Sequence, residues 1–204
     1  MTDTEDDIRE FARVTAVDAT PELARFMTAM RRLQDIAVST NPDIAVWNDT
    51  AALIEDVCAR LEEHKAPEGV AHGGRARNLP GNGHPLMPPW QVVESGPDEV
   101  TMRGHFTRFH VGGNGAVHGG VIPLFYDWHF GMLVSAAGRP DSRTAYLHVD
   151  YRQVTPTDEP LLSRAWIDYV DGRKLFVRAA MTDLDGNVLS EANGLMIKLL
   201  PHQP

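Results

Sequence analysis

The sequence predicts an α+β protein in which an antiparallel sheet surrounds one buried helix, preceded by a helical N-terminal extension. Before residue 66 the apolar residues recur at helical spacing, whereas after residue 90 most apolar runs have the length and flanking turns of strands. One segment, residues 121–137, is long enough for a helix and apolar nearly all round, which is typical of a buried helix.

The first 65 residues are expected to form helices. Apolar side chains share one face in residues 8–14, in residues 23–33 and in residues 50–64. Asp18 or Thr20 is expected to cap the second helix, with a proline just inside its first turn, and Pro42 separates it from the third.

Residues 66–89 are rich in glycine and proline and have no apolar period. Such a stretch is either an extended connector or a loop lying over another part of the molecule. We therefore divide the chain into a helical extension (1–65), a linker (66–89) and a sheet domain (90–200).

Six strands are expected in the sheet domain, and the helix follows the second of them after a glycine-rich turn at residues 112–117. Asp171-Gly172 and Asp185-Gly186 are hairpin turn signals that join the last three strands. The expected strands are residues 90–94, 100–111, 144–154, 161–170, 174–182 and 188–199.

Composition restricts the partners. The net charge of -9 argues against nucleic acid and anionic membranes, although a local basic pocket can still hold an anion. Cys58 is the single cysteine, so no intramolecular disulfide forms, which fits a reducing compartment. The acidic N-terminus does not resemble a secretory signal, and no apolar run approaches a membrane span. We expect a cytoplasmic protein with no nucleic-acid or membrane partner.

The candidate site lies where the glycine-rich turn meets the apolar helix. Glycines let the backbone approach a ligand, and the free N–H groups of a first helical turn can hold a carbonyl oxygen that becomes negative. Asp127 is one of few polar side chains in this helix. A buried carboxylate is costly unless it is paired or used, and burial raises its pKa.

Asp127 and the nearby His118 also have structural interpretations. Asp127 can be an aspartate bonded to a neighbouring hydroxyl or amide, and His118 can pack at a strand-to-helix corner. The triplet His118-Gly119-Gly120 recurs as His72-Gly73-Gly74 inside the linker, where Gly81 stands at the position that corresponds to Asp127. The triplet therefore gains meaning only from the helix and the carboxylate that follow it.

Gly115, His118-Gly119-Gly120 and Asp127 together resemble the phenylacetate-pathway type of hotdog-fold acyl-CoA thioesterase. That family carries a G-x-x-H-G-G run and, seven residues after its last glycine, a catalytic aspartate on the central helix. The resemblance covers roughly residues 85–200. It implies a hotdog fold, an antiparallel sheet wrapped around a long central helix, and hydrolysis of an acyl-CoA thioester.

The resemblance also implies a role for each matching residue. Asp127 corresponds to the nucleophile or general base, and the Gly119 N–H to the amide that polarises the thioester carbonyl. His118 is expected to support the loop. Thr144 falls where several relatives place a Ser or Thr that positions water.

One position departs from the family pattern. Many relatives have an asparagine six residues before the histidine, where this chain has Gly112. Asn114, two residues later, is the candidate to replace it; otherwise that polar contact is absent.

Arg152, Arg173 and Lys174 are candidates to bind the phosphates of coenzyme A, the alternative being solvated ends of strands and hairpins. The histidines lack a metal-ligand spacing, so no metal is expected. No cofactor is expected either, because coenzyme A would enter as part of the substrate.

Two other functions stay open. One is a hotdog hydratase or dehydratase, which needs an Asp and a His together, whereas Asp127 and His129 point about 200° apart on a helix. The other is a non-catalytic acyl-CoA-binding or regulatory protein.

Helix geometry also predicts assembly. Gly119 and Asp127 are eight residues apart, which is about 12 Å along a helix, too far for both to reach one thioester carbon. Two antiparallel helices related by a twofold axis would bring them together, so we expect a homodimer, with a dimer of dimers as a further option.

Overall fold

The computed structural model describes residues 16–67 and 69–200. They fall into two compact units, with described residues 16–85 in one and 86–200 in the other. The helix expected at residues 8–14 lies outside the described residues.

The first unit contains α1 (Pro21–Ala37), α2 (Ile44–Glu62) and a short 3₁₀ turn, η1 (Pro80–Gly83). Thr20 caps α1, since its side chain accepts a hydrogen bond from the Leu23 N–H, and a proline occupies the first turn. The cap predicted as Asp18 or Thr20 is therefore Thr20.

Helix α2 begins six residues earlier than the predicted start at residue 50. Asp43 caps it by accepting a hydrogen bond from the Val46 N–H at 2.9 Å. The apolar spacing did not predict this start, because the capping residue Asp43 determines where the helix begins.

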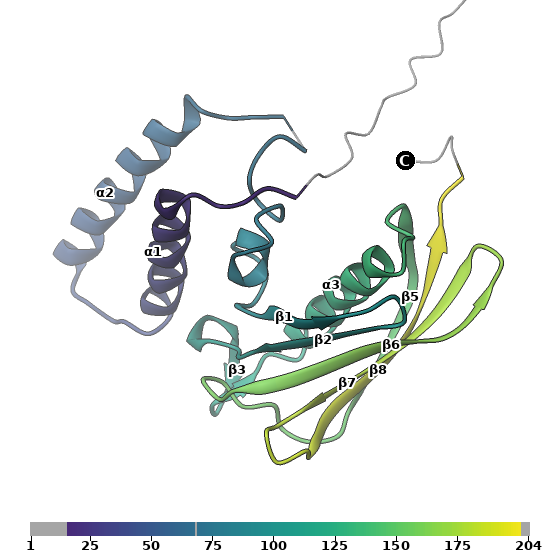
Figure 1. Cartoon of the computed structure of the whole chain (residues 1–204). Coiled ribbons are helices and arrows are strands. Elements are labelled where there is room, and N and C mark those ends of the chain that lie inside the picture. The colour runs from purple at the N-terminus through teal and green to yellow at the C-terminus, as the bar shows by residue number, and fades with distance from the viewer. Residues whose placement is uncertain (1–15, 68, 201–204) are drawn as a thin grey trace, which may run out of the picture. The chain divides into compact units, whose positions relative to one another are not determined.

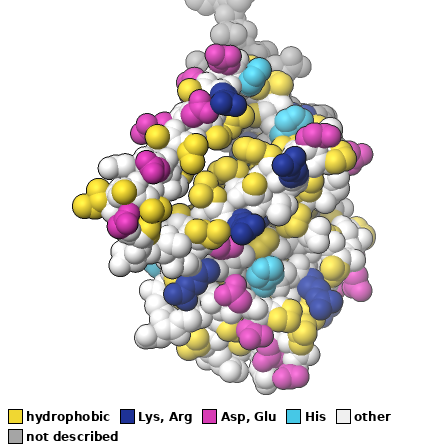
Figure 2. Space-filling model, turned by 90° about the vertical axis from the view of Figure 1, so that its left-hand side faces the viewer, with side chains coloured by type: hydrophobic (Ala, Val, Ile, Leu, Met, Phe, Trp, Pro, Cys, Tyr) yellow, Lys and Arg dark blue, Asp and Glu magenta, His cyan; other side chains and the backbone are white. Residues whose placement is uncertain are grey.

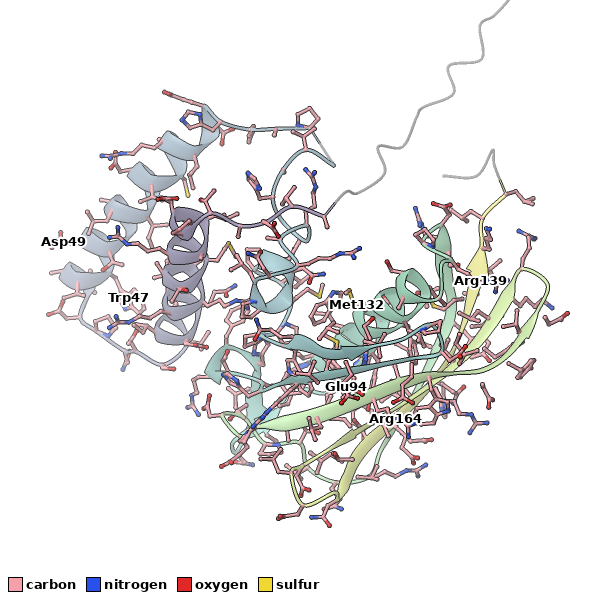
Figure 3. All side chains as sticks on the ribbon, viewed as in Figure 1. Trp47, Asp49, Glu94, Met132, Arg139 and Arg164 are labelled. Atoms are coloured by element: carbon pink, nitrogen blue, oxygen red, sulfur yellow. The ribbon has the colours of Figure 1, made fainter. Side chains whose placement is uncertain are left out.

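No residue of α2 is buried. Figure 2 shows hydrophobic side chains at the surface beside acidic ones, and Figure 3 labels Trp47 and Asp49 on α2.

Part of the glycine- and proline-rich segment is bonded to α1. The Arg31 guanidinium donates to the carbonyls of Pro80 and His84, at 3.0 and 3.2 Å. The Gln34 amide donates to the Pro85 carbonyl at 3.2 Å. Residues 80–85 thus lie over α1 within their own unit.

The second unit is an antiparallel six-stranded sheet that curls around one helix, α3 (Val121–Ala136) (Figure 1). The strand order is β1-β2-β6-β7-β8-β5, so β1 and β5 form the two edges. The strands are β1 (Gln91–Ser95), β2 (Glu99–Gly104), β5 (Ser142–Tyr151), β6 (Leu161–Asp171), β7 (Lys174–Thr182) and β8 (Val188–Lys198).

The core lies between α3 and the inner face of the sheet. Along β7 and β8, buried and more exposed side chains alternate, as expected when one sheet face is covered. The largest side chains without exposed surface come from α3, β2, β6, β7 and the segments that flank β1 and β2. They include Trp90, Phe106, Phe125, Tyr126, Phe130, Leu133 and Leu161.

The strand predicted at residues 100–111 is shorter than expected. β2 ends at Gly104, opposite Leu161 of β6. A Cβ at Gly104 would lie 2.4 Å from the Trp90 ring, so only glycine fits where the chain passes this side chain. The following residues form a 3₁₀ turn, η2 (Arg108–His110), and a small hairpin of β3 (Val111–Gly113) and β4 (Ala116–Val117).

Candidate active site

The β3–β4 hairpin leads into α3 through a turn that glycine makes possible. Asn114 and Gly115 both have positive φ angles, 50° and 76°, as a tight Asn-Gly hairpin turn requires. A Cβ at Gly112 would lie 2.7 Å from the His118 Cα. Any side chain at Gly112 would therefore force this backbone to shift, and Asn114 has the positive φ that the turn requires.

His118 ties this turn together through its backbone and its ring. Its N–H donates to the His110 carbonyl at 2.8 Å, and its carbonyl accepts from the Val121 N–H at 2.9 Å. The ring Nδ1 accepts a hydrogen bond from the Gly120 N–H at 3.0 Å. This contact satisfies one of the backbone donors that open α3.

Gly119 is exposed at the head of α3. Its carbonyl accepts a hydrogen bond from the Tyr151 hydroxyl at 2.7 Å. Within residues 16–67 and 69–200, its N–H has no hydrogen-bond acceptor. The positive end of the helix dipole lies at the same place, so this amide is suited to bind an anionic oxygen.

Asp127 is exposed, which corrects the expectation that this chain buries it. The sheet covers only one side of α3, and Asp127 lies on the other side. Its Oδ1 accepts a hydrogen bond from the Thr144 hydroxyl at 2.7 Å. Thr144 is on the edge strand β5, so the two residues meet although they are 17 positions apart in the chain.

His129 faces the opposite way, into the core, with no exposed surface. Its Nε2 lies 3.0 Å from the Val100 carbonyl oxygen and its Nδ1 lies 3.1 Å from the Ser163 hydroxyl. A carbonyl only accepts, so Nε2 carries the proton and Nδ1 accepts from Ser163. Burial lowers the pKa of His129 to about 4, against a smaller opposing effect of the Val100 hydrogen bond. His129 cannot share a proton with Asp127, which weakens the hydratase alternative.

The three candidate phosphate ligands lie at two ends of the sheet. Arg152 follows the last residue of β5, where it pairs with Glu191 at 2.7 Å and Asp150 at 3.2 Å. The hydrogen bond with Glu191 is the main reason that the pKa of Arg152 is raised. Arg173 and Lys174 lie at the β6–β7 turn, near the start of β5, because β8 pairs Lys174 and Arg143 with the same residue, Ile197.

Arg139 adds a cation at that second end, just beyond the C-terminal end of α3 (Figure 3). Its guanidinium donates to the Gly172 carbonyl at 2.7 Å, and that of Arg173 donates to the Lys198 carbonyl at 3.1 Å. The β6–β7 turn thus gathers several cations around backbone carbonyls.

Tyr151 is the residue at this site that sequence reasoning missed. It lies inside a predicted strand, and its contact with Gly119 spans 32 positions. No local pattern signals such a contact, because it depends on β5 running antiparallel to α3.

The described residues contain neither a metal-binding cluster nor a membrane-spanning helix. No three His, Cys, Asp or Glu side chains come together there in a way that could hold a metal ion. In the same part of the chain, no helix combines the length and the apolar character needed to cross a membrane.

Comparison with known proteins places this unit. Residues 114–190 match the model of the thioesterase superfamily. The crystal structure of a thioesterase superfamily protein superposes with a TM-score of 0.77 at 26% sequence identity, covering 90% of this chain and 98% of the other. The sheet-and-helix unit has a hotdog fold, as its sequence predicted, and its residues 114–190 are similar to the thioesterase superfamily.

Curated relatives match less than half of this chain. The acyl-coenzyme A thioesterase THEM4 of Rattus norvegicus is 34% identical over 91 residues, and that of Mus musculus is 33% identical over 91 residues. These matches cover 44% of this chain, and the chain spans only 39% of the length of each relative. A Streptococcus mutans protein crystallised with acetyl-CoA shares the fold at 17% identity and a TM-score of 0.52, over 54% of this chain and 88% of that one.

Proposed function

We propose that this protein hydrolyses an acyl-CoA thioester to a free carboxylic acid and coenzyme A. One observation carries the proposal. The exposed face of α3 presents a carboxylate bonded to a hydroxyl, Asp127 with Thr144, and its N-terminus presents the Gly119 N–H, which has no acceptor among the described residues. A base or nucleophile and an oxyanion donor are the two parts that thioester hydrolysis needs.

Two routes are open to Asp127. As a nucleophile, its carboxylate attacks the thioester carbon, expels the coenzyme A thiolate and leaves an anhydride that water cleaves. As a general base, it takes a proton from water, the hydroxide attacks the same carbon, and the thiolate leaves and is then protonated. Thr144 holds the carboxylate in position in both routes, through its hydroxyl.

The Gly119 amide is proposed to bind the thioester carbonyl oxygen. That oxygen becomes negative as the carbon is attacked, so an amide that has no other acceptor among the described residues stabilises the transition state more than the ground state. His118 keeps the turn in shape through the Gly120 N–H.

A second copy of the chain is proposed to complete each site. Asp127 is bonded to Thr144 near the start of β5, and Gly119 is bonded to Tyr151 at its end. If two β5 edges pair antiparallel with Thr144 opposite Tyr151 of the second copy, Asp127 of each copy comes beside Gly119 of the other. Most of β5 is exposed, and an unpaired edge is a ready template for such pairing.

The uncovered side of α3 supports the same assembly. A helix that is apolar nearly all round is normally buried on all sides. In this chain the sheet covers one side, and Gly131 is exposed together with Asp127 on the other. A Cβ at Gly131 would meet nothing within 4 Å, which leaves room for a second helix to approach closely.

This pairing would also gather the candidate phosphate ligands. It brings Arg152 of one copy to the end of the sheet where the other copy carries Arg173 and Lys174. We propose that these three side chains bind the phosphates of coenzyme A across the two copies. The name of the THEM4 relatives and the acetyl-CoA bound to the Streptococcus mutans protein support a ligand of this class.

Thiol release from a panel of acyl-CoA substrates tests the reaction. Replacing Asp127 with Asn keeps its size but removes the charge, so kcat should fall by roughly 10² to 10⁴ while the Michaelis constant changes less. Asp98→Asn, on the β1–β2 turn at the other edge of the sheet, is the matched control.

Two outcomes would contradict the proposal. If Asp127→Asn lowers the melting temperature but leaves turnover at the wild-type rate, the aspartate is structural. If the wild-type chain binds acyl-CoA and releases no thiol, the protein is a non-catalytic binding module instead.

Mixing two inactive variants tests the shared site. In a hybrid of Asp127→Asn and Gly119→Pro copies, one site carries both defects and the other carries neither. Random mixing makes half of the dimers hybrids, so activity should return to about a quarter of the wild-type rate. If each site belongs to a single chain, mixing restores nothing. Light scattering on the same samples should show a dimer or a dimer of dimers.

A further inference from the structure

Tyr151 ends strand β5 directly beside the turn that opens α3. Its hydroxyl donates a hydrogen bond to the Gly119 carbonyl at 2.7 Å. The side chain is 53% exposed, so burial does not explain its place.

The hydrogen bonds of the turn leave one donor free. The His118 carbonyl accepts from the Val121 N–H at 2.9 Å, which holds the peptide group between His118 and Gly119 at its oxygen end. The next peptide group is held at both ends. Tyr151 binds its oxygen on Gly119, and the His118 ring binds its N–H on Gly120 at 3.0 Å. Among the described residues, only the Gly119 N–H lacks an acceptor in these two peptide groups.

We infer that Tyr151 is a positioning residue, whose hydroxyl fixes the Gly119 peptide so that the Gly119 N–H points at the substrate carbonyl. The inference rests on the proposed thioester hydrolysis. Glycine populates more backbone conformations than any other residue, so a glycine that must aim a donor needs an outside anchor. Because each peptide group is planar, holding the Gly119 oxygen limits rotation on the C-terminal side of that amide.

The position of Tyr151 distinguishes this positioning role from a contribution to the global stability of the fold. The hydrogen bond joins an exposed residue to an exposed turn, so its loss should hardly change global stability. It should instead broaden the orientations of one amide. A preorganised oxyanion donor is most effective when it needs no rearrangement as the reaction proceeds.

Tyr151→Phe tests this inference because it removes only the hydroxyl. Tyr169→Phe is the matched control, since Tyr169 lies on β6, away from the edge proposed to pair with a second copy, is also 53% exposed and makes no hydrogen bond through its hydroxyl to the described residues. Thiol release and thermal melting are measured on both variants. The NMR order parameters of the Gly119 and Gly120 amides are measured on the same preparations.

For Tyr151→Phe, kcat should fall roughly three- to tenfold, the effect expected of one neutral hydrogen bond. The Michaelis constant and melting temperature should stay near those of the wild type. The order parameters of both glycine amides should fall, since they report backbone motion directly. Tyr169→Phe should change none of these quantities.

Unchanged order parameters in Tyr151→Phe would overturn the inference, even with a lower kcat, because the hydroxyl would then act on the substrate itself. Lower order parameters with an unchanged kcat would also overturn it, because the orientation of the amide would not matter for catalysis. If the wild-type protein cleaves no acyl-CoA, the proposed function fails. The order parameters then still decide, separately, whether Tyr151 holds the turn.

Discussion

The buried histidine of α3 should make the stability of this protein depend on pH in a defined window. His129 has no exposed surface, and burial lowers its pKa from 6.5 to about 4. In the unfolded chain the same ring takes up a proton near pH 6.5. Between these two values the unfolded state binds more protons than the folded state, so acid favours unfolding.

The size of the effect follows from the two pKa values. A drop from 6.5 to about 4 corresponds to roughly 3 kcal/mol, since each tenfold change in an equilibrium is worth about 1.4 kcal/mol. This stability is fully present above pH 6.5, is lost progressively as the pH falls, and is absent below about pH 4. Other acidic and basic groups also titrate there, so a variant is needed to isolate His129.

His129→Gln is that variant, because the glutamine amide can still donate to the Val100 carbonyl but cannot be protonated. Its loss of the Ser163 bond should lower the free energy of unfolding at pH 7.5 by about 1–3 kcal/mol. Urea unfolding between pH 7.5 and pH 4.5 should show the gap to the wild type closing as the pH falls. A gap that stays constant over this range would refute the reasoning.

Two further predictions concern the turn and the edge strand. Thr144→Val removes the hydrogen bond to Asp127 at nearly constant volume, so kcat should fall roughly 10- to 100-fold, whereas Thr144→Ser should retain most activity in the same thiol-release assay. Equal activity in both variants would show that the hydroxyl is dispensable. Gly112→Ala places a methyl group 2.7 Å from the His118 Cα and should lower the free energy of unfolding by about 1–3 kcal/mol in thermal melting. A variant as stable as the wild type would mean that the turn can shift without cost.

Local chemistry in the sequence was sufficient to predict much of the fold. The strand at residues 174–182 was predicted with the bounds that β7 has, because Asp-Gly turns delimit it on both sides. The central helix was predicted within one residue of its end, because an apolar run of that length has few other forms. The spacing between Gly115, the His-Gly-Gly run and Asp127 predicted a resemblance to hotdog thioesterases, and residues 114–190 match the model of the thioesterase superfamily.

Other features were decided by packing between distant segments. The strand predicted through residue 111 stops at Gly104 because pairing with β6 ends there and the chain must pass Trp90. A prediction from propensity continues a strand over every residue that favours one, whereas a strand in the folded protein ends where its pairing with the neighbouring strand ends. The same limit applies to the hydrogen bond between Tyr151 and Gly119, which no local spacing encodes.

The exposure of Asp127 shows most clearly the difference between what the sequence determined and what the tertiary structure decided. An apolar helix with one carboxylate predicts burial, and the sequence contains no sign of which side the sheet will cover. The tertiary structure covers the side that carries His129 and leaves Asp127 on the open side with Thr144. Composition and spacing thus determined the helix and its carboxylate. Only the antiparallel course of α3 and β5 decided their surroundings, because contacts across the sheet depend on topology rather than on neighbours in the chain.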